Sequence, residues 1–335
     1  MSKKRLFISL ALVLVLALSF SLAGCAKKDK ALDKITLTEV THSVFYAPQY
    51  AAIYLGYFEE EGIELELVNG GGADKSMAAL LSGQADFGLM GPEAALYVTI
   101  AENKDPAVVI GQLTKRDGSF IVGREPLQGE FDWEGMRGKS IIGGRPGGMP
   151  LMTLEYVLKS KGLEPGSDID VITNIQFDMM GGAFVGGTGD FTTLFEPAAS
   201  QFEKEGKGYV LESVGSASGE VPYTAYMVRQ SMIDSDPDLV QRFVNAIAKG
   251  QKWVQEHTPE EIAEVIKPAF PDSDDEILAA VAKRYKDVDA WMTTPVMTED
   301  SFTRLQDIME EAGELARRVD FGEVIDNQFA EKTVK

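Results

Sequence analysis

Three charged residues stand beside glycine or proline at places where they could bind a small molecule. Arg145 lies in a glycine-rich loop that ends at Gly148, Glu93 comes two residues after Gly91, and Glu196 precedes a proline. The guanidinium fork of Arg145 suits a carboxylate or sulfonate, whereas the two carboxylates suit a cationic or amide group. Helices that begin at Gly91 and Gly148 would present free N–H groups, which favour an anion or a carbonyl oxygen. These residues predict the binding of a small polar molecule.

Aromatic and small residues extend this set. Phe45, Tyr46 and Tyr223 could stack on a planar ligand, or they could belong to the core. His42 could contact the ligand through its ring, although a lone histidine more often makes a plain polar contact. Gly72 ends a glycine triplet that either permits close backbone approach to a ligand or forms only a flexible connection. We include all five residues among the expected ligand-binding positions.

The charged candidates also have simpler explanations. The loop around Arg145 could be a tight turn, and it is not a phosphate-binding P-loop because no Gly-Lys-Ser or Gly-Lys-Thr follows. Glu196 could be a carboxylate at the start of a helix, ahead of Pro197. The acidic runs at 59–61 and 272–275 are typical of solvated faces. The sequence therefore leaves two kinds of ligand open: an anion held by Arg145, or a planar or nitrogen-bearing molecule held by the carboxylates and aromatic rings.

Motifs for catalysis are absent, so we predict no enzyme, no catalytic residues, no cofactor and no metal site. One cysteine and two distant histidines leave no Cys–His pair. Neither a Gly-x-Ser-x-Gly elbow nor a His-Glu-x-x-His motif occurs. Carboxylate pairs stay open as an alternative, because an acidic chain contains many of them.

The elements that must position these residues alternate between strand and helix patterns. Apolar spacing in the first part predicts strands at 35–40, 63–67 and 86–90 and helices at 48–61 and 74–82. The same order recurs with strands at 139–143, 169–173 and 190–195 and helices at 150–161 and 178–185. This repetition predicts two similar α/β lobes, each a mainly parallel sheet flanked by helices. Ligands of such sheets sit outside the carboxyl ends of the strands, where most of the candidate residues fall.

Two helix-to-strand junctions support the repetition. Residues 82–87 read Ser-Gly-Gln-Ala-Asp-Phe and residues 186–191 read Gly-Gly-Thr-Gly-Asp-Phe, although Gly-x-x-Asp is common at such turns. From residue 236 the pattern is helical only, which predicts a tail packed on a lobe already formed. We expect lobe 1 at 35–113 plus 225–335, lobe 2 at 124–220, and hinge crossings at 114–123 and 221–225.

The first 25 residues have the pattern of a bacterial lipoprotein signal. A basic start and an uncharged apolar run at 6–20 lead through Leu22-Ala23-Gly24 to Cys25, the only cysteine. We expect cleavage of residues 1–24, diacylation of Cys25 and a tether at 25–34. An ordinary cleaved signal would leave Cys25 unexplained, and the apolar run is short for a transmembrane anchor. The prediction is a protein anchored by lipid on the extracytoplasmic face of the cell membrane.

Composition sets further limits. The 335 residues suit two lobes, and 44% of them are hydrophobic, which is enough for a sizeable core. A formal net charge of −20 repels nucleic acid and anionic lipid, so we expect neither as a partner. Acylation of Cys25 would leave no thiol, which excludes disulfides and cysteine-based metal sites.

Several segments together resemble one family. Residues 45–50, Phe-Tyr-Ala-Pro-Gln-Tyr, and 56–63, Gly-Tyr-Phe-Glu-Glu-Glu-Gly-Ile, look like the opening of ABC-transporter solute-binding lipoproteins of the sulfonate, nitrate, taurine and thiamine-precursor group, called SsuA/THI5-like. Further segments resemble that group's first-lobe junction, second-lobe entry and hinge region: 80–88, 137–148 and 196–208. The loop at 41–46 has neither the Trp nor the Cys-rich motif of some thiamine-precursor members.

This resemblance implies a two-lobed periplasmic-binding-protein fold of type II that closes on its ligand. It also implies two kinds of partner, a small-molecule ligand and an ABC permease with its ATPase subunits. We predict a membrane-anchored solute-binding component of an ABC importer, acting as a monomer, that captures a small organic or anionic solute of sulfonate, nitrate or thiamine-precursor type. An extracytoplasmic enzyme, or a sensory or structural lipoprotein on the same fold, is the alternative.

Overall fold

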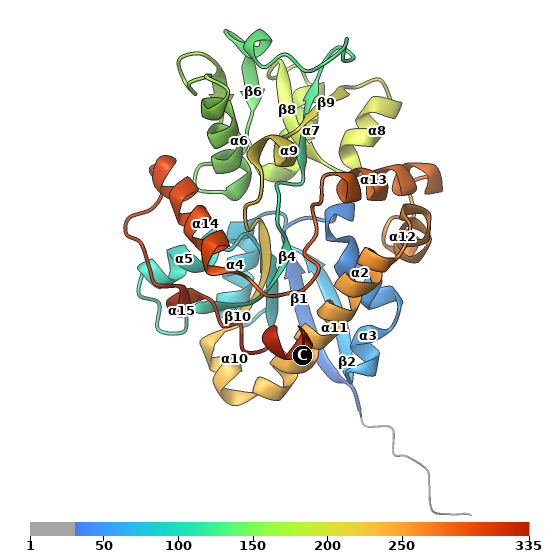
Figure 1. Ribbon diagram of the computed structural model, residues 1–335, viewed down its shortest axis with the longest axis vertical. Helices are drawn as coiled ribbons and strands as arrows, with labels where there is room; N and C mark the ends of the chain where they lie inside the picture. Colours follow the sequence, from blue (N-terminus) through green and yellow to red (C-terminus); the bar gives the residue numbers. More distant parts are fainter. Residues whose placement is uncertain (1–30, 335) are drawn as a thin grey trace, which may run out of the picture. The chain divides into compact units, whose positions relative to one another are not determined.

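The computed structural model describes residues 31–334. From Asp33 onward the chain forms one compact unit, which holds all the elements described below (Figure 1). The expected signal peptide and Cys25 lie outside the described residues. Asp33 and Lys34, expected in the tether, instead open a strand because they pair with a neighbouring strand. None of the helices that the structure describes combines the length and the apolar character needed to cross a bilayer.

The first sheet has five strands in the order β2-β1-β3-β10-β4. Its strands are β1 (Asp33–Glu39), β2 (Ile63–Asn69), β3 (Phe87–Met90), β4 (Ala107–Thr114) and β10 (Thr224–Arg229). The elements between them are η1 (Val44–Tyr46), α2 (Ala47–Tyr54), α3 (Tyr57–Glu60), α4 (Ala73–Ser82) and α5 (Glu93–Ile100). Strand β10 runs antiparallel to the other four strands of this sheet. Strand β4 is buried along its whole length, as expected of a mainly parallel sheet covered on both faces.

The second sheet repeats this plan in the order β7-β6-β8-β5-β9, with β5 antiparallel to its neighbours. Its strands are β5 (Ser119–Gly123), β6 (Ser140–Ile142), β7 (Asp170–Ile172), β8 (Phe191–Phe195) and β9 (Tyr209–Ser213). The helices with it are η2 (Glu134–Met136), α6 (Met149–Ser160), η3 (Phe177–Met179), α7 (Met180–Val185), α8 (Ala198–Lys204) and α9 (Val214–Ser218). The predicted class, two mainly parallel sheets flanked by helices, is confirmed.

The two similar junctions make the same contact in the two sheets. Oδ2 of Asp86 accepts a 2.9 Å hydrogen bond from the backbone N–H of Thr36 in β1. Oδ2 of Asp190 accepts a 2.8 Å hydrogen bond from the backbone N–H of Ser140 in β6. The aspartate ties the entry of β3 to β1 in the first sheet and the entry of β8 to β6 in the second. This shared contact explains why the same short sequence recurs.

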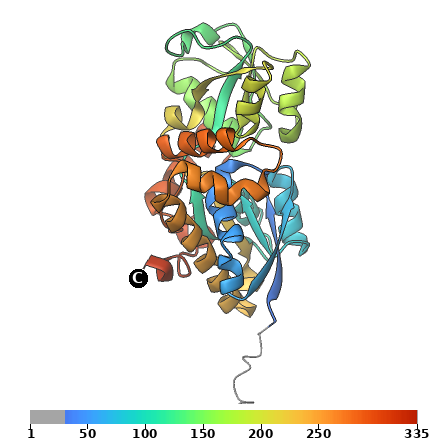
Figure 2. The same cartoon turned by 90° about the vertical axis from the view of Figure 1, so that its right-hand side faces the viewer.

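The helical tail follows β10 and covers the first sheet from several directions. Its helices are α10 (Gln230–Ser235), α11 (Pro237–Glu256), α12 (Pro259–Ile266), η4 (Lys267–Ala269), α13 (Asp275–Asp287), α14 (Glu299–Glu311), α15 (Phe321–Val324) and η5 (Glu331–Val334). Helix α11 packs on α2 and α3, and the orange and red helices run along the first sheet in Figure 2. Helix α14 also packs on α6, so the tail contacts both lobes.

The chain passes between the sheets near two short segments. Strand β5, expected in the first crossing, belongs to the second sheet, where it pairs with β8 and β9. We therefore propose crossings at 115–118 and 219–223, shifted from the predicted ones. Below, the first lobe is the β2-β1-β3-β10-β4 sheet with α2 to α5 and the tail, and the second lobe is residues 119–218.

Candidate ligand-binding site

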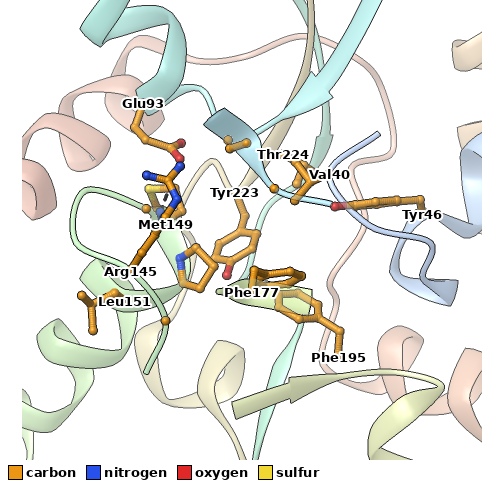
Figure 3. Close-up of a pocket in the computed structure, with 16 residues that line it drawn as sticks. Val40, Tyr46, Glu93, Arg145, Met149, Leu151, Phe177, Phe195, Tyr223 and Thr224 are labelled. Atoms are coloured by element: carbon orange, nitrogen blue, oxygen red, sulfur yellow. Dashed lines mark hydrogen bonds between the residues drawn. The ribbon is translucent and has the colours of Figure 1, made fainter. Parts of the chain in front are cut away.

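A cavity of about 50 Å³ lies where strand ends of the two sheets meet, and we call it the interlobe cavity (Figure 3). It is lined by Val40, Tyr46, Gly72, Ala73, Gly91, Glu93, Gly144, Arg145, Gly148, Met149, Pro150, Leu151, Phe177, Phe195, Tyr223 and Thr224. One ordered water needs roughly 10–15 Å³ of such space, so the cavity has room for several waters or a small molecule. Most of its wall is aliphatic or aromatic, and two side chains bring charge.

Glu93 supplies the negative charge. It opens α5 directly after the turn that leaves β3, and its side chain is 2% exposed. Oε1 accepts a 3.3 Å hydrogen bond from the backbone N–H of Met149 in the second lobe, whereas Oε2 has no partner. Burial raises the pKa of Glu93 to about 7, while N–H groups at its own helix start, the Met149 N–H and the charge of Arg145 act to lower it. A Cβ on Gly91 would lie 1.9 Å from Oε2, so the turn needs glycine for this carboxylate to fold back.

Arg145 supplies the positive charge from the loop between β6 and α6. The loop turns through Gly144 and Gly147, whose φ angles of +96° and +73° favour glycine. The guanidinium is partly exposed and pairs at 3.4 Å with Oδ1 of Asp74, in the first turn of α4. In Figure 3 it also points toward the carboxylate of Glu93. Its charge is therefore shared between two carboxylates of the first lobe.

Aromatic rings form the rest of the wall. Tyr46 is buried, and burial raises the pKa of its phenol. The hydroxyl of Tyr223 is buried beside the carboxylate of Asp117, and burial raises the pKa of Tyr223 as well. The ring centroid of Phe195 lies 5.6 Å from that of Phe177 and 6.2 Å from that of Tyr223. Aromatic rings from both lobes thus line the cavity, and rings of this kind can stack on a planar molecule.

Seven of the ten ligand-binding residues expected from the sequence line this cavity. They are Tyr46, Gly72, Gly91, Glu93, Arg145, Gly148 and Tyr223. The remaining three, His42, Phe45 and Glu196, lie outside its lining.

Phe45 belongs to the core behind the cavity. Its ring centroid lies 5.6 Å from that of Tyr46 and 5.2 Å from that of Tyr285 in α13. Its carbonyl accepts a 2.8 Å hydrogen bond from Nε1 of Trp291. Phe45 therefore supports the ring of Tyr46, which is the core alternative that the sequence left open.

His42 is held by partners of its own. Nδ1 lies 2.8 Å from Oε1 of Glu39, and Nε2 lies 2.7 Å from the carbonyl oxygen of Ala269. The hydrogen bond with Glu39 raises the pKa of His42. The ring lines a second cavity, of about 280 Å³, on the far side of Phe177 and Phe195.

Glu196 also faces the second cavity, and its carboxylate is engaged. It pairs with Arg284 of α13 and accepts 2.8 Å hydrogen bonds from both N and Oγ of Ser200. Its backbone carbonyl accepts a hydrogen bond from Oγ of Ser43 in the first lobe. The contact with the Ser200 N–H is that of a carboxylate at a helix start, and burial raises its pKa against these partners.

Sequence reasoning missed several wall residues, chiefly Phe177, Met149 and Leu151. Phe177 lies in η3, directly after the loop that follows β7, and the rule of strand carboxyl ends would have included it. The helix predicted at 178–185 begins one residue after Phe177, so Phe177 was not among the expected site residues. Met149 and Leu151 read as ordinary apolar residues of a helix, and both are indeed buried at the start of α6.

In the part of the chain that the structure describes, no three residues among histidine, cysteine, aspartate and glutamate lie close enough together to hold a metal ion.

Comparison with known proteins identifies relatives over most of the chain. A family model described as NMT1/THI5 like matches residues 44–262. The chain is 42% identical over 315 residues to the Bacillus subtilis (strain 168) protein named "Putative binding protein YtlA", a match that covers 94% of each chain.

Solved structures share the fold at low sequence identity. The alkanesulfonate-binding protein SsuA from Xanthomonas axonopodis pv. citri, bound to MOPS, has a TM-score of 0.70 at 16% identity, over 89% of this chain and 99% of that one. The nitrate-binding protein NrtA from Synechocystis PCC 6803 has a TM-score of 0.72 at 15% identity, over 90% of this chain and 88% of that one. The desulfurization enzyme DSZB also matches, with a TM-score of 0.63 at 14% identity over 90% and 99%. The fold itself therefore serves both binding and catalysis.

Proposed function

The chain belongs to the NMT1/THI5-like family, and from that premise we propose that it is the solute-binding component of an ABC importer. The observation that carries the proposal is the interlobe cavity, whose wall comes from both lobes and contains a buried carboxylate with an unpartnered oxygen. A buried polar atom of this kind costs free energy unless a ligand or water satisfies it. The cavity is thus suited to hold a small polar molecule.

Contacts between the lobes explain how binding can be coupled to closure. The hydroxyl of Tyr97 in α5 donates a 3.0 Å hydrogen bond to the carbonyl of Gly147, next to the ion pair of Asp74 with Arg145. Separation of the lobes would break these contacts and open the cavity. A ligand that touches both lobes stabilises the closed form, because it binds that form more tightly than the open one.

Delivery of the solute requires a membrane partner. We propose an ABC permease with its ATPase subunits, a diacyl anchor at Cys25 and a monomer on the extracytoplasmic face of the cell membrane. The anchor proposal rests on the lipobox-like sequence alone. The solute itself is proposed to be small and organic or anionic, and its class is taken up below.

Catalysis is the competing function because an enzyme shares the fold. The wall of the interlobe cavity holds no cysteine, histidine, serine or lysine, and the hydroxyl of its one threonine, Thr224, is engaged at 2.6 Å by the hydroxyl of Thr114. Its one carboxylate and one guanidinium are suited to recognition. The alternative of a sensory or structural lipoprotein does not explain why a buried carboxylate oxygen in the cavity wall is left unpaired.

Natively purified protein can test the proposed function. Mass spectrometry of the small molecules released on denaturation should find one compound bound near one equivalent. Calorimetry with that compound should give saturable binding, and incubation should leave it chemically unchanged. Recovery of no compound from cells or from fractionated cell extract, or conversion of the compound into a product, would count against the proposal.

A further inference from the structure

Two helix starts from different lobes converge on the carboxylate of Glu93. The side chain of Glu93 folds back over the start of its own helix, α5, on one side, where a Cβ on Gly91 would lie 1.9 Å from Oε2. The N–H of Met149, at the start of α6, donates to Oε1 from the other. Free N–H groups at helix starts are the usual binding place for an anion. Here a side chain of the protein already provides that anion.

The charge around the cavity also disfavours the entry of a second anion. Glu93 and Asp74 are two carboxylates of the first lobe, and Arg145 is one guanidinium that serves both. Lys75 and Asp178, outside the lining of the cavity, pair with each other at 3.9 Å. With Glu93 ionised, the carboxylates around the cavity outnumber the cations. A second anion would enter against this charge and would find the helix starts occupied.

A buried oxygen without a hydrogen-bond partner indicates which kind of group a ligand would supply to the cavity. Oε2 of Glu93 can only accept while it is ionised, so it requires a donor. The buried hydroxyl of Tyr223 lies beside the carboxylate of Asp117, so Oε2 of Glu93 is the atom of the wall that lacks a donor. The rings of Tyr46, Phe177 and Phe195 form an apolar part of the same wall.

We propose that the interlobe cavity selects a small planar molecule that presents a cationic or N–H-donating nitrogen to Oε2 of Glu93, and that the Glu93 carboxylate excludes small anions such as nitrate and sulfonates. This inference rests on the proposed function, because it names the class of solute for the same cavity. Amino-substituted heteroaromatic rings and aryl amidines have the required shape and donors.

The pH dependence of binding has a definite sign. The titratable and charged groups that act on or surround Glu93 come from every neighbouring element: Tyr46, Asp74, Tyr97, Arg145, Tyr223 and Glu314. The tyrosines have raised pKa values and stay neutral near pH 7. Only ionisation of Glu93 then changes the charge of the wall near neutral pH, so affinity for a cation should rise as pH increases through 7 and affinity for an anion should fall.

Probes of opposite charge and matched shape test the inference. We would measure the dissociation constants of benzamidine, 4-aminopyridine, benzoate, nitrate and methanesulfonate by calorimetry between pH 6 and 8, with thermal shift as a second readout. Benzamidine and benzoate have nearly the same shape, so their comparison isolates charge. The expected result is that the two cations bind, more tightly at pH 8 than at pH 6, and that the three anions do not.

Variants of Glu93 sharpen the test. Glu93→Gln keeps the shape, removes the charge and should weaken cation binding at least tenfold. Glu93→Ala empties the place between the helix starts and should gain binding of nitrate or methanesulfonate. As a control, Glu59→Gln makes the same change of charge at an exposed residue of α3 and should alter neither cation binding nor anion binding.

Contrary outcomes are distinguishable. Tighter binding of benzoate, nitrate or methanesulfonate than of the cations by the unmodified chain would overturn the inference and leave the proposed function standing. Cation binding that Glu93→Gln leaves unchanged would also overturn it, as would failure of all five probes to bind. The proposed function fails only if the mass-spectrometric search for a retained compound fails as well.

Discussion

The backbone N–H of Met149 donates a 3.3 Å hydrogen bond to Oε1 of Glu93, which joins the start of α6 in the second lobe to the start of α5 in the first. The bond completes the wall of the interlobe cavity from two sheets that do not pair with each other. A site built in this way exists in full only while the lobes are together. We therefore expect ligand binding to be coupled to lobe closure.

Tyr46 should contribute to binding through its ring. Tyr46→Ala removes one wall of the cavity and should weaken the retained ligand at least tenfold, about 1.4 kcal/mol on the affinity scale. Tyr46→Phe keeps the ring and should cost less than threefold, because the structure gives the hydroxyl no hydrogen bond within the protein. Calorimetry on both variants checks this, and equal affinities of the two would place the ligand elsewhere.

Arg284 should matter for stability because it neutralises buried Glu196. Arg284→Met leaves that carboxylate buried without its ion pair and should lower the free energy of unfolding by about 1–3 kcal/mol, since Arg284 is itself partly exposed. Adding Glu196→Gln should recover part of the loss. Urea denaturation of the single and double variants provides the measurement. No recovery in the double variant would show that Arg284 acts through packing.

Asp117 should make stability depend on pH near the first crossing. Its carboxyl is 1% exposed, and burial raises its pKa from 3.8 to about 6, against hydrogen bonds from N and Oγ of Ser119. A raised pKa means that the folded chain holds the proton longer than the unfolded chain, so stability should fall as pH rises from about 3.8 to 6. The loss is on the order of 3 kcal/mol.

Asp117→Asn tests this sign. Relative to the unmodified chain, the variant should gain stability at pH 7.5 and gain little or nothing at pH 4. Unfolding free energies from urea denaturation at several pH values give the comparison. Parallel pH profiles for the two proteins would contradict the assignment to Asp117. Glu93 is shifted in the same direction, so the unmodified chain should keep some pH dependence from that residue.

Cys25 should determine membrane attachment. Cys25→Ser removes the thiol that acylation needs, and the chain should then be released or keep its first 24 residues. Lys30→Ser, outside the lipobox-like sequence, should leave attachment intact. Membrane fractionation and intact-mass measurement distinguish these results, and an unchanged mass and location of Cys25→Ser would refute the lipoprotein proposal.

Much of the fold was predictable because it is encoded locally. Apolar periodicity gave the alternating strands and helices, and the recurring aspartate of the two junctions reflects one hydrogen bond made twice, by Asp86 and by Asp190. The interlobe cavity was partly predictable for a related reason. Residues such as Glu93 and Arg145 follow strands, and strand ends of similar sheets meet at one cavity.

The missed features depend on distant partners. Glu196 and His42 were expected at the ligand, but their partners Arg284 and Ala269 come from the tail, 88 and 227 residues further along the chain. No local pattern reveals such a pairing. Strand β5 was predicted to be part of the first crossing. It is a strand because it pairs with β8 and β9, which follow much later in the sequence, so no local pattern identifies it.

The distance between the lobes tests the central claim most directly. Spin labels on Gln84→Cys in the first lobe and Glu130→Cys in the second, both exposed, would report that distance in the otherwise cysteine-free chain with residue 25 changed to serine. Saturation with the retained compound should shift the population toward a single shorter distance, and Glu93→Gln should shift the midpoint to at least tenfold higher concentration. A distance distribution that the compound leaves unchanged at saturation would contradict binding between the lobes.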